Sequence, residues 1–223
     1  MVHEITALQK KHIAWLKELK EKGLSPPAAL AAYVDRSVPN LSSIVVLVES
    51  SGKRMLLTGD ARGDKIIEGL QLVGLLGHGT SSTMKVDILK VPHHGSANNL
   101  DTDFFDRIHA KHYVFSGNGE HGNPEREAFE MLVRSRGTEG YIIHLTYPIE
   151  VIDKARKLDW EKEQRKEKTR AIKKSETKVR PDWSPGRHSL ESFFADSNGL
   201  ADRVRIVKDG ESHVIDLLDA VRI

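Results

Sequence analysis

Short apolar segments alternate with segments of helical pattern along the middle of the chain, and this alternation constrains the fold most. The apolar segments are rich in Val, Ile and Leu and end at turn residues, which is typical of buried strands. Strands are expected at 40–49, 54–58, 86–91, 112–116 and 140–146, and helices at 64–76, 101–108 and 124–136. Strands that alternate with helices predict an α/β layered fold.

The chain divides into four segments by pattern and composition. They are a helical N-terminal segment (1–36), the α/β region (37–150), a basic helix or linker (151–186) and a small C-terminal α/β appendage (187–223). The first segment is expected to form an amphipathic helix at His3–Lys22. In the appendage, Asp209-Gly210 lies between two alternating stretches, 204–207 and 213–218, and predicts a β-hairpin.

The positive charge of the chain is concentrated in the basic segment. Asp153–Arg180 holds 12 Lys and Arg against 6 Asp and Glu, a surplus of 6 (12 minus 6), whereas the whole chain has a formal net charge of only +2. A mixed-charge run is typical of a solvated helix. Its lysines and arginines also permit contact with the phosphates of nucleic acid. Trp160 and Trp183 flank this segment, either as packing anchors or as platforms for bases.

Composition excludes several classes of protein. With 30% charged residues and no apolar run near the ~18–20 residues of a spanning helix, the chain is not expected to enter a membrane. It opens without the basic-then-apolar pattern of a signal peptide, so the cytoplasm is the expected compartment. Cysteine is absent, which excludes disulfides and thiolate metal sites. A metal would therefore bind to His, Asp or Glu.

Two motifs place chemically useful side chains directly after predicted strands. The first, Leu56–Asp60, ends in Thr-Gly-Asp, and the second, Leu89–Ser96, ends in Pro-His-His-Gly-Ser. Loops at strand ends, held by a rigid sheet, are where catalytic groups concentrate in α/β proteins. Carboxylate and imidazole ligands suit zinc, manganese or iron. A metal bound there activates water and polarises a phosphoryl or carbonyl oxygen.

The order strand, turn, strand with Thr-Gly-Asp, helix, then Val-Asp-Ile-Leu-Lys-Val-Pro-His-His-Gly-Ser resembles the second half of the metallo-β-lactamase fold. The similarity is to the ComEC-like group of hydrolases and covers roughly 37–146. It implies a partial αβ/βα sandwich and, in an intact member, two zinc or manganese ions. The implied ligands are Asp60, as the bridging carboxylate, and His93 or His94. The resemblance also implies that Ser96, Ser116 and His121 lie near the substrate, with His121 close to the Asn123-Pro124 pair.

The first-half signature of that family, His-x-His-x-Asp-His, is absent from the sequence, and none of the 11 histidines forms a His-x-His pair. We therefore expect the chain to be the C-terminal half of a longer hydrolase, as a gene fragment, a product of a late start codon or one part of a split protein. The other part, or a second copy of the chain, would supply the missing ligands. This hypothesis also predicts an exposed apolar edge and face of the sheet.

Two functions remain open from the sequence. The chain is either part of a metal-dependent hydrolase of phosphodiester or other ester bonds, or a half-fold that binds protein or nucleic acid through Asp153–Arg180. Among the other histidines, His78 is expected in an exposed loop, His144 in the core or at an edge, and His213 at the surface. Lys90 is expected either to meet an anionic substrate or to form a salt bridge.

Overall fold

The computed structural model describes residues 40, 42–100, 102–138, 140–173, 177–197, 199–208 and 211–217. The chain divides into two compact units, Met1–Arg36 and Ser37–Ile223, and all the described residues belong to the second unit. The amphipathic helix expected at His3–Lys22 lies outside the described residues.

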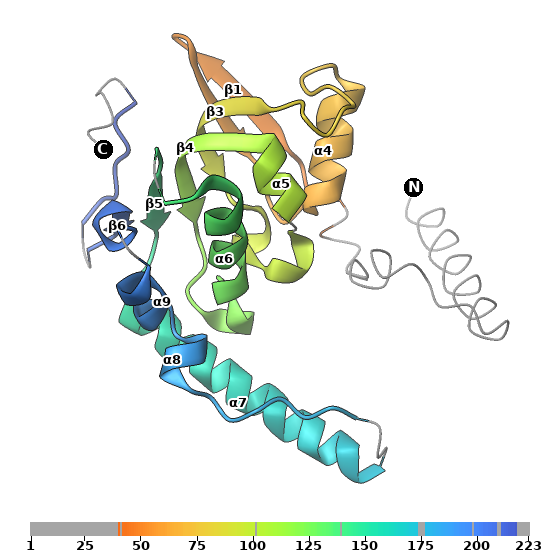
Figure 1. Cartoon of the computed structure of the whole chain (residues 1–223), viewed down its shortest axis with the longest axis vertical. Helices are drawn as coiled ribbons and strands as arrows, with labels where there is room; N and C mark the ends of the chain where they lie inside the picture. Colours follow the sequence, from red (N-terminus) through yellow and green to blue (C-terminus); the bar gives the residue numbers. More distant parts are fainter. Residues whose placement is uncertain are drawn as a thin grey trace, which may run out of the picture. The chain divides into compact units, whose positions relative to one another are not determined.

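A six-stranded sheet forms the centre of this unit, and its strands are ordered β1 to β6 as in the chain (Figure 1). β1 and β2 form an antiparallel hairpin, whereas every later pair of neighbours is parallel. The strands are β1 (Val46–Ser50), β2 (Lys53–Leu57), β3 (Met84–Lys90), β4 (Ile108–Phe115), β5 (Ile142–Leu145) and β6 (Val204–Ile206). The mixed α/β fold that the sequence predicts is thus confirmed.

Three helices connect the parallel strands: α4 (Gly63–Leu72), α5 (Thr102–Arg107) and α6 (Arg126–Arg136). Because β2 to β5 follow one another in one direction across the sheet, right-handed crossovers place all three helices on the same face (Figure 1). The core forms between these helices and the sheet. Its fully buried side chains include Leu56, Leu89, Tyr113, Phe115, Ile143, Phe104, Phe105, Phe129 and Leu132.

The C-terminal region adds to this core and sheet. After α7 (Ile149–Lys173) come α8 (Pro185–His188) and α9 (Leu190–Asp196), and Leu190, Phe193 and Phe194 of α9 are buried in the main core. The hairpin expected across 204–218 is wrong for the described residues: β6 pairs in parallel with β5, and 211–217 form no strand. The open edge of β5 offers ladder hydrogen bonds to β6, and the sequence gives no signal of this long-range pairing.

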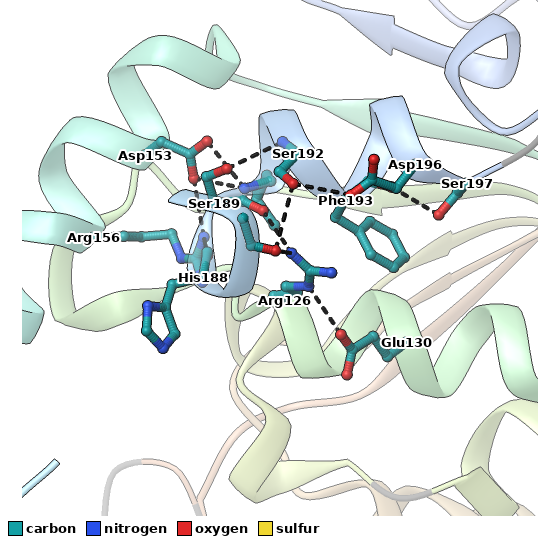
Figure 2. Close-up of polar contacts among 12 residues, drawn as sticks. Arg126, Glu130, Asp153, Arg156, His188, Ser189, Ser192, Phe193, Asp196 and Ser197 are labelled. Atoms are coloured by element: carbon teal, nitrogen blue, oxygen red, sulfur yellow. Dashed lines mark hydrogen bonds and ion pairs between the residues drawn. The ribbon is translucent and has the colours of Figure 1, made fainter. Parts of the chain in front are cut away.

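Figure 2 shows how α9 is attached to α7. The carboxylate of Asp153 accepts hydrogen bonds from the backbone N–H groups of Leu190 and Glu191, at 2.9–3.0 Å, and so caps the first turn of α9. Arg156 donates to Asp153 at 3.0 Å and to the carbonyl oxygen of His188 at 2.8 Å. Burial lowers the pKa of Arg156, and Asp153 opposes that shift. This buried pair joins the basic segment to the rest of the fold.

β1 is an edge strand with exposed apolar side chains. Val46 and Val48 are 42% and 39% exposed, and Leu57, the partner of Val46 in β2, is 37% exposed. Val46, Val48 and Leu57 share one face of the hairpin, because side chains alternate along a strand and paired residues lie on the same side. The expected exposed apolar edge is therefore present. No helix in the described part of the chain is long and apolar enough to cross a membrane.

Candidate functional site

Side chains that follow four successive strands converge on one open pocket of about 400 Å³. It lies at the carboxyl ends of β2 to β5, where ligand sites of parallel sheets are found. Its lining residues are Asp60, His93, His94, Ser116, Gly117, Asn118, Glu120, His121, Asn123 and Tyr147. Five of the six site residues predicted from the sequence are among them.

Asp60 follows β2 and lies at the centre of the polar contacts. Its Oδ1 is 3.4 Å from Nε2 of His94 and 3.7 Å from Nζ of Lys90. Lys90 also donates to the carbonyl oxygen of Gly59 at 2.7 Å, so its ammonium is fixed beside the carboxylate. Burial lowers the pKa of Lys90, and the charge of Asp60 opposes the shift. Of the two roles considered for Lys90, the structure shows the salt bridge.

His94 bridges two strand ends. Its Nε2 faces Asp60, and its Nδ1 is 3.1 Å from the hydroxyl oxygen of Ser116, which directly follows β4. A contact on the second ring nitrogen fixes the orientation of an imidazole. Histidines that bind metal ions commonly have such a partner on the nitrogen that does not bind the metal. Ser116 therefore orients His94 in addition to lining the pocket.

His93 is held from the opposite side by two asparagines. Its Nδ1 is 2.7 Å from Nδ2 of Asn99 and 3.3 Å from Nδ2 of Asn40. Its backbone N–H donates to Gly59 at 3.1 Å, which ties the Pro-His-His loop to the Thr-Gly-Asp turn. The sequence analysis missed Asn99. Its amide is buried, and burial is not visible in the sequence, so no local signal could have identified it.

The backbone at the pocket histidines is unusual. His93, His94 and His121 have φ of 46°, 56° and 57°, in the left-handed region that costs a non-glycine residue about 1–2 kcal/mol. Ser51, in the β1–β2 turn, is the one other non-glycine residue with positive φ in the described ranges. Strained backbone that clusters in one pocket is a feature of functional sites.

Ser96 lies apart from the other predicted site residues. Its side chain is buried, and its hydroxyl donates to Oε1 of Glu125 at 3.1 Å. The same oxygen accepts from the backbone N–H of Ala97 at 3.1 Å, and the N–H of Glu125 donates to Gly95 at 3.0 Å. Burial, with a smaller effect of Glu127, raises the pKa of Glu125. Ser96 and Glu125 thus fasten the His-His loop to the loop before α6.

Gly95 is required by close packing at this point. Its φ is +85°, and an added Cβ would lie 2.6 Å from Cδ1 of Phe115 and 2.9 Å from Cβ of Pro124. No side chain fits there without displacing the core ring or the proline. The glycine of the His-His-Gly-Ser motif therefore sets the backbone path of the two histidines.

The pocket suits a metal ion in chemistry but not in number of ligands. Asp60 and His94 are oxygen and nitrogen donors of the kind that zinc and manganese accept. A structural zinc site has four protein ligands, and a catalytic one has three protein ligands and a water. In the described ranges, no group of three or more His, Asp or Glu side chains is placed to hold a metal ion. Asp60 and one histidine alone would leave such a site short of protein ligands.

No family model matches the chain. The chain is 29% identical over 132 residues to "ComE operon protein 3" of Bacillus subtilis (strain 168), covering 58% of this chain and 15% of that protein. It is also 29% identical over 125 residues to "Microtubule-associated protein 1A" of Rattus norvegicus, covering 56% of this chain and 4% of that protein. The chain thus spans a small part of the length of either relative. The first similarity is to a ComE protein and covers part of the chain.

Proposed function

We propose that the pocket is one part of the active site of a metal-dependent hydrolase of the metallo-β-lactamase type, acting on phosphodiester or other ester bonds. The observation that carries this proposal is the 3.4 Å approach of Asp60 Oδ1 to His94 Nε2. These atoms come from motifs more than thirty residues apart and meet at the carboxyl ends of neighbouring parallel strands. The partial similarity to ComE operon protein 3 agrees with the resemblance of the sequence to the ComEC-like group.

Each pocket residue has a defined part in this proposal. Asp60 and His94 present an oxygen and a nitrogen ligand, and Ser116 keeps the imidazole in place. His93 and His121 line the same pocket and contact the substrate. A zinc or manganese ion bound there supplies activated water and polarises the ester oxygen.

The remaining ligands come, in this proposal, from a second part of the active site. In the purified chain, a second copy supplies them; in the cell, another segment of a longer protein or a separate chain can take its place. The exposed apolar residues of the β1–β2 hairpin, Val46, Val48 and Leu57, support such a second part, because an apolar sheet edge favours association.

Metal content tests the proposal. We expect elemental analysis of the purified chain, after incubation with zinc or manganese, to show bound metal that Asp60→Ala and His94→Ala each remove. The chain with bound metal should hydrolyse bis(p-nitrophenyl) phosphate or p-nitrophenyl acetate, and both variants should lose that activity.

His78→Ala is the matched control, because His78 is exposed in a loop and does not line the pocket. It should keep the metal and the activity of the wild type. A wild type without metal, or an Asp60→Ala variant that retains all of it, would contradict the proposal.

A further inference from the structure

The acidic residues of α7 are largely engaged within the protein. Asp153 caps α9 and pairs with Arg156 (Figure 2). Glu167 accepts from the backbone N–H and the guanidinium of Arg180, at 2.8 and 2.9 Å. Arg180 belongs to residues 177–184, which we call the strap because they run back along α7. The negative charges on this side of α7 are therefore neutralised by internal contacts.

The strap also covers the aromatic side chains of the basic segment. Nε1 of Trp160 donates to the carbonyl oxygen of Pro181 at 2.9 Å, and the Arg180 guanidinium lies 4.8 Å from the ring centroid of Trp160. Trp160 and Trp183 pack edge to face, with His188 against both rings. These contacts hold the two tryptophans in place as packing anchors of the strap.

Another side of α7 presents positive charge. Lys154, Lys162, Arg165 and Lys173 are exposed, and none of them forms an ion pair within the described part of the chain. We call these four residues the basic face. At about 100° of rotation per residue they fall within roughly 100° of the helix circumference, and at about 1.5 Å per residue they extend over about 28 Å. No Asp or Glu shares this arc.

The apolar side chains near the basic face are too sparse for a lipid surface. Val151, Leu158 and Ile172 are exposed by 45%, 59% and 87%. Leu158 and Ile172 are separated by about four turns of helix, roughly 21 Å, so they form no continuous apolar stripe. A helix that lies in a membrane surface needs such a stripe.

We propose that the basic face of α7 binds the phosphate backbone of nucleic acid. A row of unpaired cations along a straight, protruding helix complements a regular row of phosphates, which bind mainly by releasing counterions. The contacts involve side-chain charge and no base edges, so binding is independent of sequence. This inference does not depend on the hydrolase proposal, since none of its residues lines the pocket at the strand ends.

Salt-dependent binding of DNA tests the inference. We expect a fluorescent 30-base-pair duplex to bind with a log–log salt slope of about −3 to −4, corresponding to four phosphate contacts, and affinity to fall about 100-fold between 50 and 200 mM salt. The variant Lys154→Gln/Lys162→Gln/Arg165→Gln/Lys173→Gln should lose at least about tenfold in affinity at 50 mM salt and most of the slope.

A matched control removes the same charge elsewhere. Lys65→Gln/Lys85→Gln/Lys111→Gln/Arg134→Gln changes exposed cations outside α7, and both variants lower the net charge from +2 to −2 (2 minus 4). The control should keep most of the affinity, and circular dichroism should show both variants folded. Equal losses in the two variants, or no DNA binding by the wild type at 50 mM salt, would overturn the inference. So would equally tight binding to phosphatidylserine vesicles or polyglutamate.

Discussion

Two groups of histidines in this protein use the same side chain in different ways. The pocket group, His93, His94 and His121, lies on loops at the strand ends and lines an open cavity. Its backbone is left-handed, and the His94 side chain is 44% exposed. These residues add local strain and little burial, so their presence is not explained by stability.

The second group is a buried chain of imidazoles. Nδ1 of His112 is 2.9 Å from Nε2 of His144, and Nδ1 of His144 is 2.7 Å from Nε2 of His213. His112 and His144 are 6% and 4% exposed. His213, expected at the surface, is half-buried, and its ring nitrogen bonds to His144. Buried imidazoles that satisfy one another hold β4, β5 and the C-terminal segment together.

Exposure and backbone strain, rather than residue type, thus distinguish the pocket histidines from the structural ones. This difference predicts opposite responses to substitution. His144→Ala should lower the free energy of unfolding by about 3 kcal/mol, because it opens a cavity and leaves the ring nitrogens of His112 and His213 unpaired. His94→Ala should cost less than about 1 kcal/mol. Urea denaturation of both variants measures the contrast, and equal costs would remove the distinction.

The response to pH should come from the buried group. Burial, with the positive charges of neighbouring groups, lowers the pKa of His144 to about 3, and burial lowers the pKa of His112. Between about 3 and the ordinary value of about 6.5, the unfolded chain therefore binds more protons than the folded one. The contribution of these two histidines to the free energy of unfolding is therefore fully present above pH 6.5 and is lost progressively as the pH falls below it. At pH 5, His144 should account for a loss of about 1–2 kcal/mol in the free energy of unfolding, allowing for partial solvent screening.

Chemical denaturation at pH 7.5 and pH 5 gives this loss directly. The variant His144→Phe should lose less stability on acidification than the wild type, because its ring has no proton to bind. His94→Ala serves as the control and should show the wild-type pH dependence. If His144→Phe and the wild type respond alike to acid, the buried chain is not the source of the effect.

The smallest effect concerns the left-handed backbone. Glycine adopts positive φ without the clash of a Cβ. His121→Gly should therefore leave stability unchanged or raise it by up to about 1 kcal/mol. His112→Gly, in the extended backbone of β4, should be strongly destabilising. Thermal unfolding of the pair measures this, and a clear destabilisation by His121→Gly would refute the strain argument.

Much of the fold is predictable from the sequence, because strands and helices are indicated by the pattern of neighbouring residues. The β1–β2 hairpin and helices α4 to α6 lie close to their expected positions. The exceptions have long-range causes. β6 pairs with β5 instead of forming a hairpin, and the appendage supplies core residues such as Phe193, since both depend on partners distant in the chain.

The candidate site was predictable in part for the same reason. Asp60 and the two histidines follow apolar strands, and the rule that strand ends of an α/β sheet hold functional groups places them together. Asn99 and Tyr147, by contrast, carry no local signal. Ser96 belongs to the motif but donates to buried Glu125, and its location away from the pocket follows from the loop path that Gly95 sets.

The alternation of strands and helices, the two strand-end motifs and the surplus of positive charge after residue 153 follow from the sequence. Periodicity, turn residues and charge are local properties. The packing of distant segments brings His94 to face Asp60 and buries His144 between His112 and His213. It also engages the acidic residues of α7 internally while four cations face outward. These outcomes depend on contacts between distant segments and on burial, which no short stretch of sequence specifies.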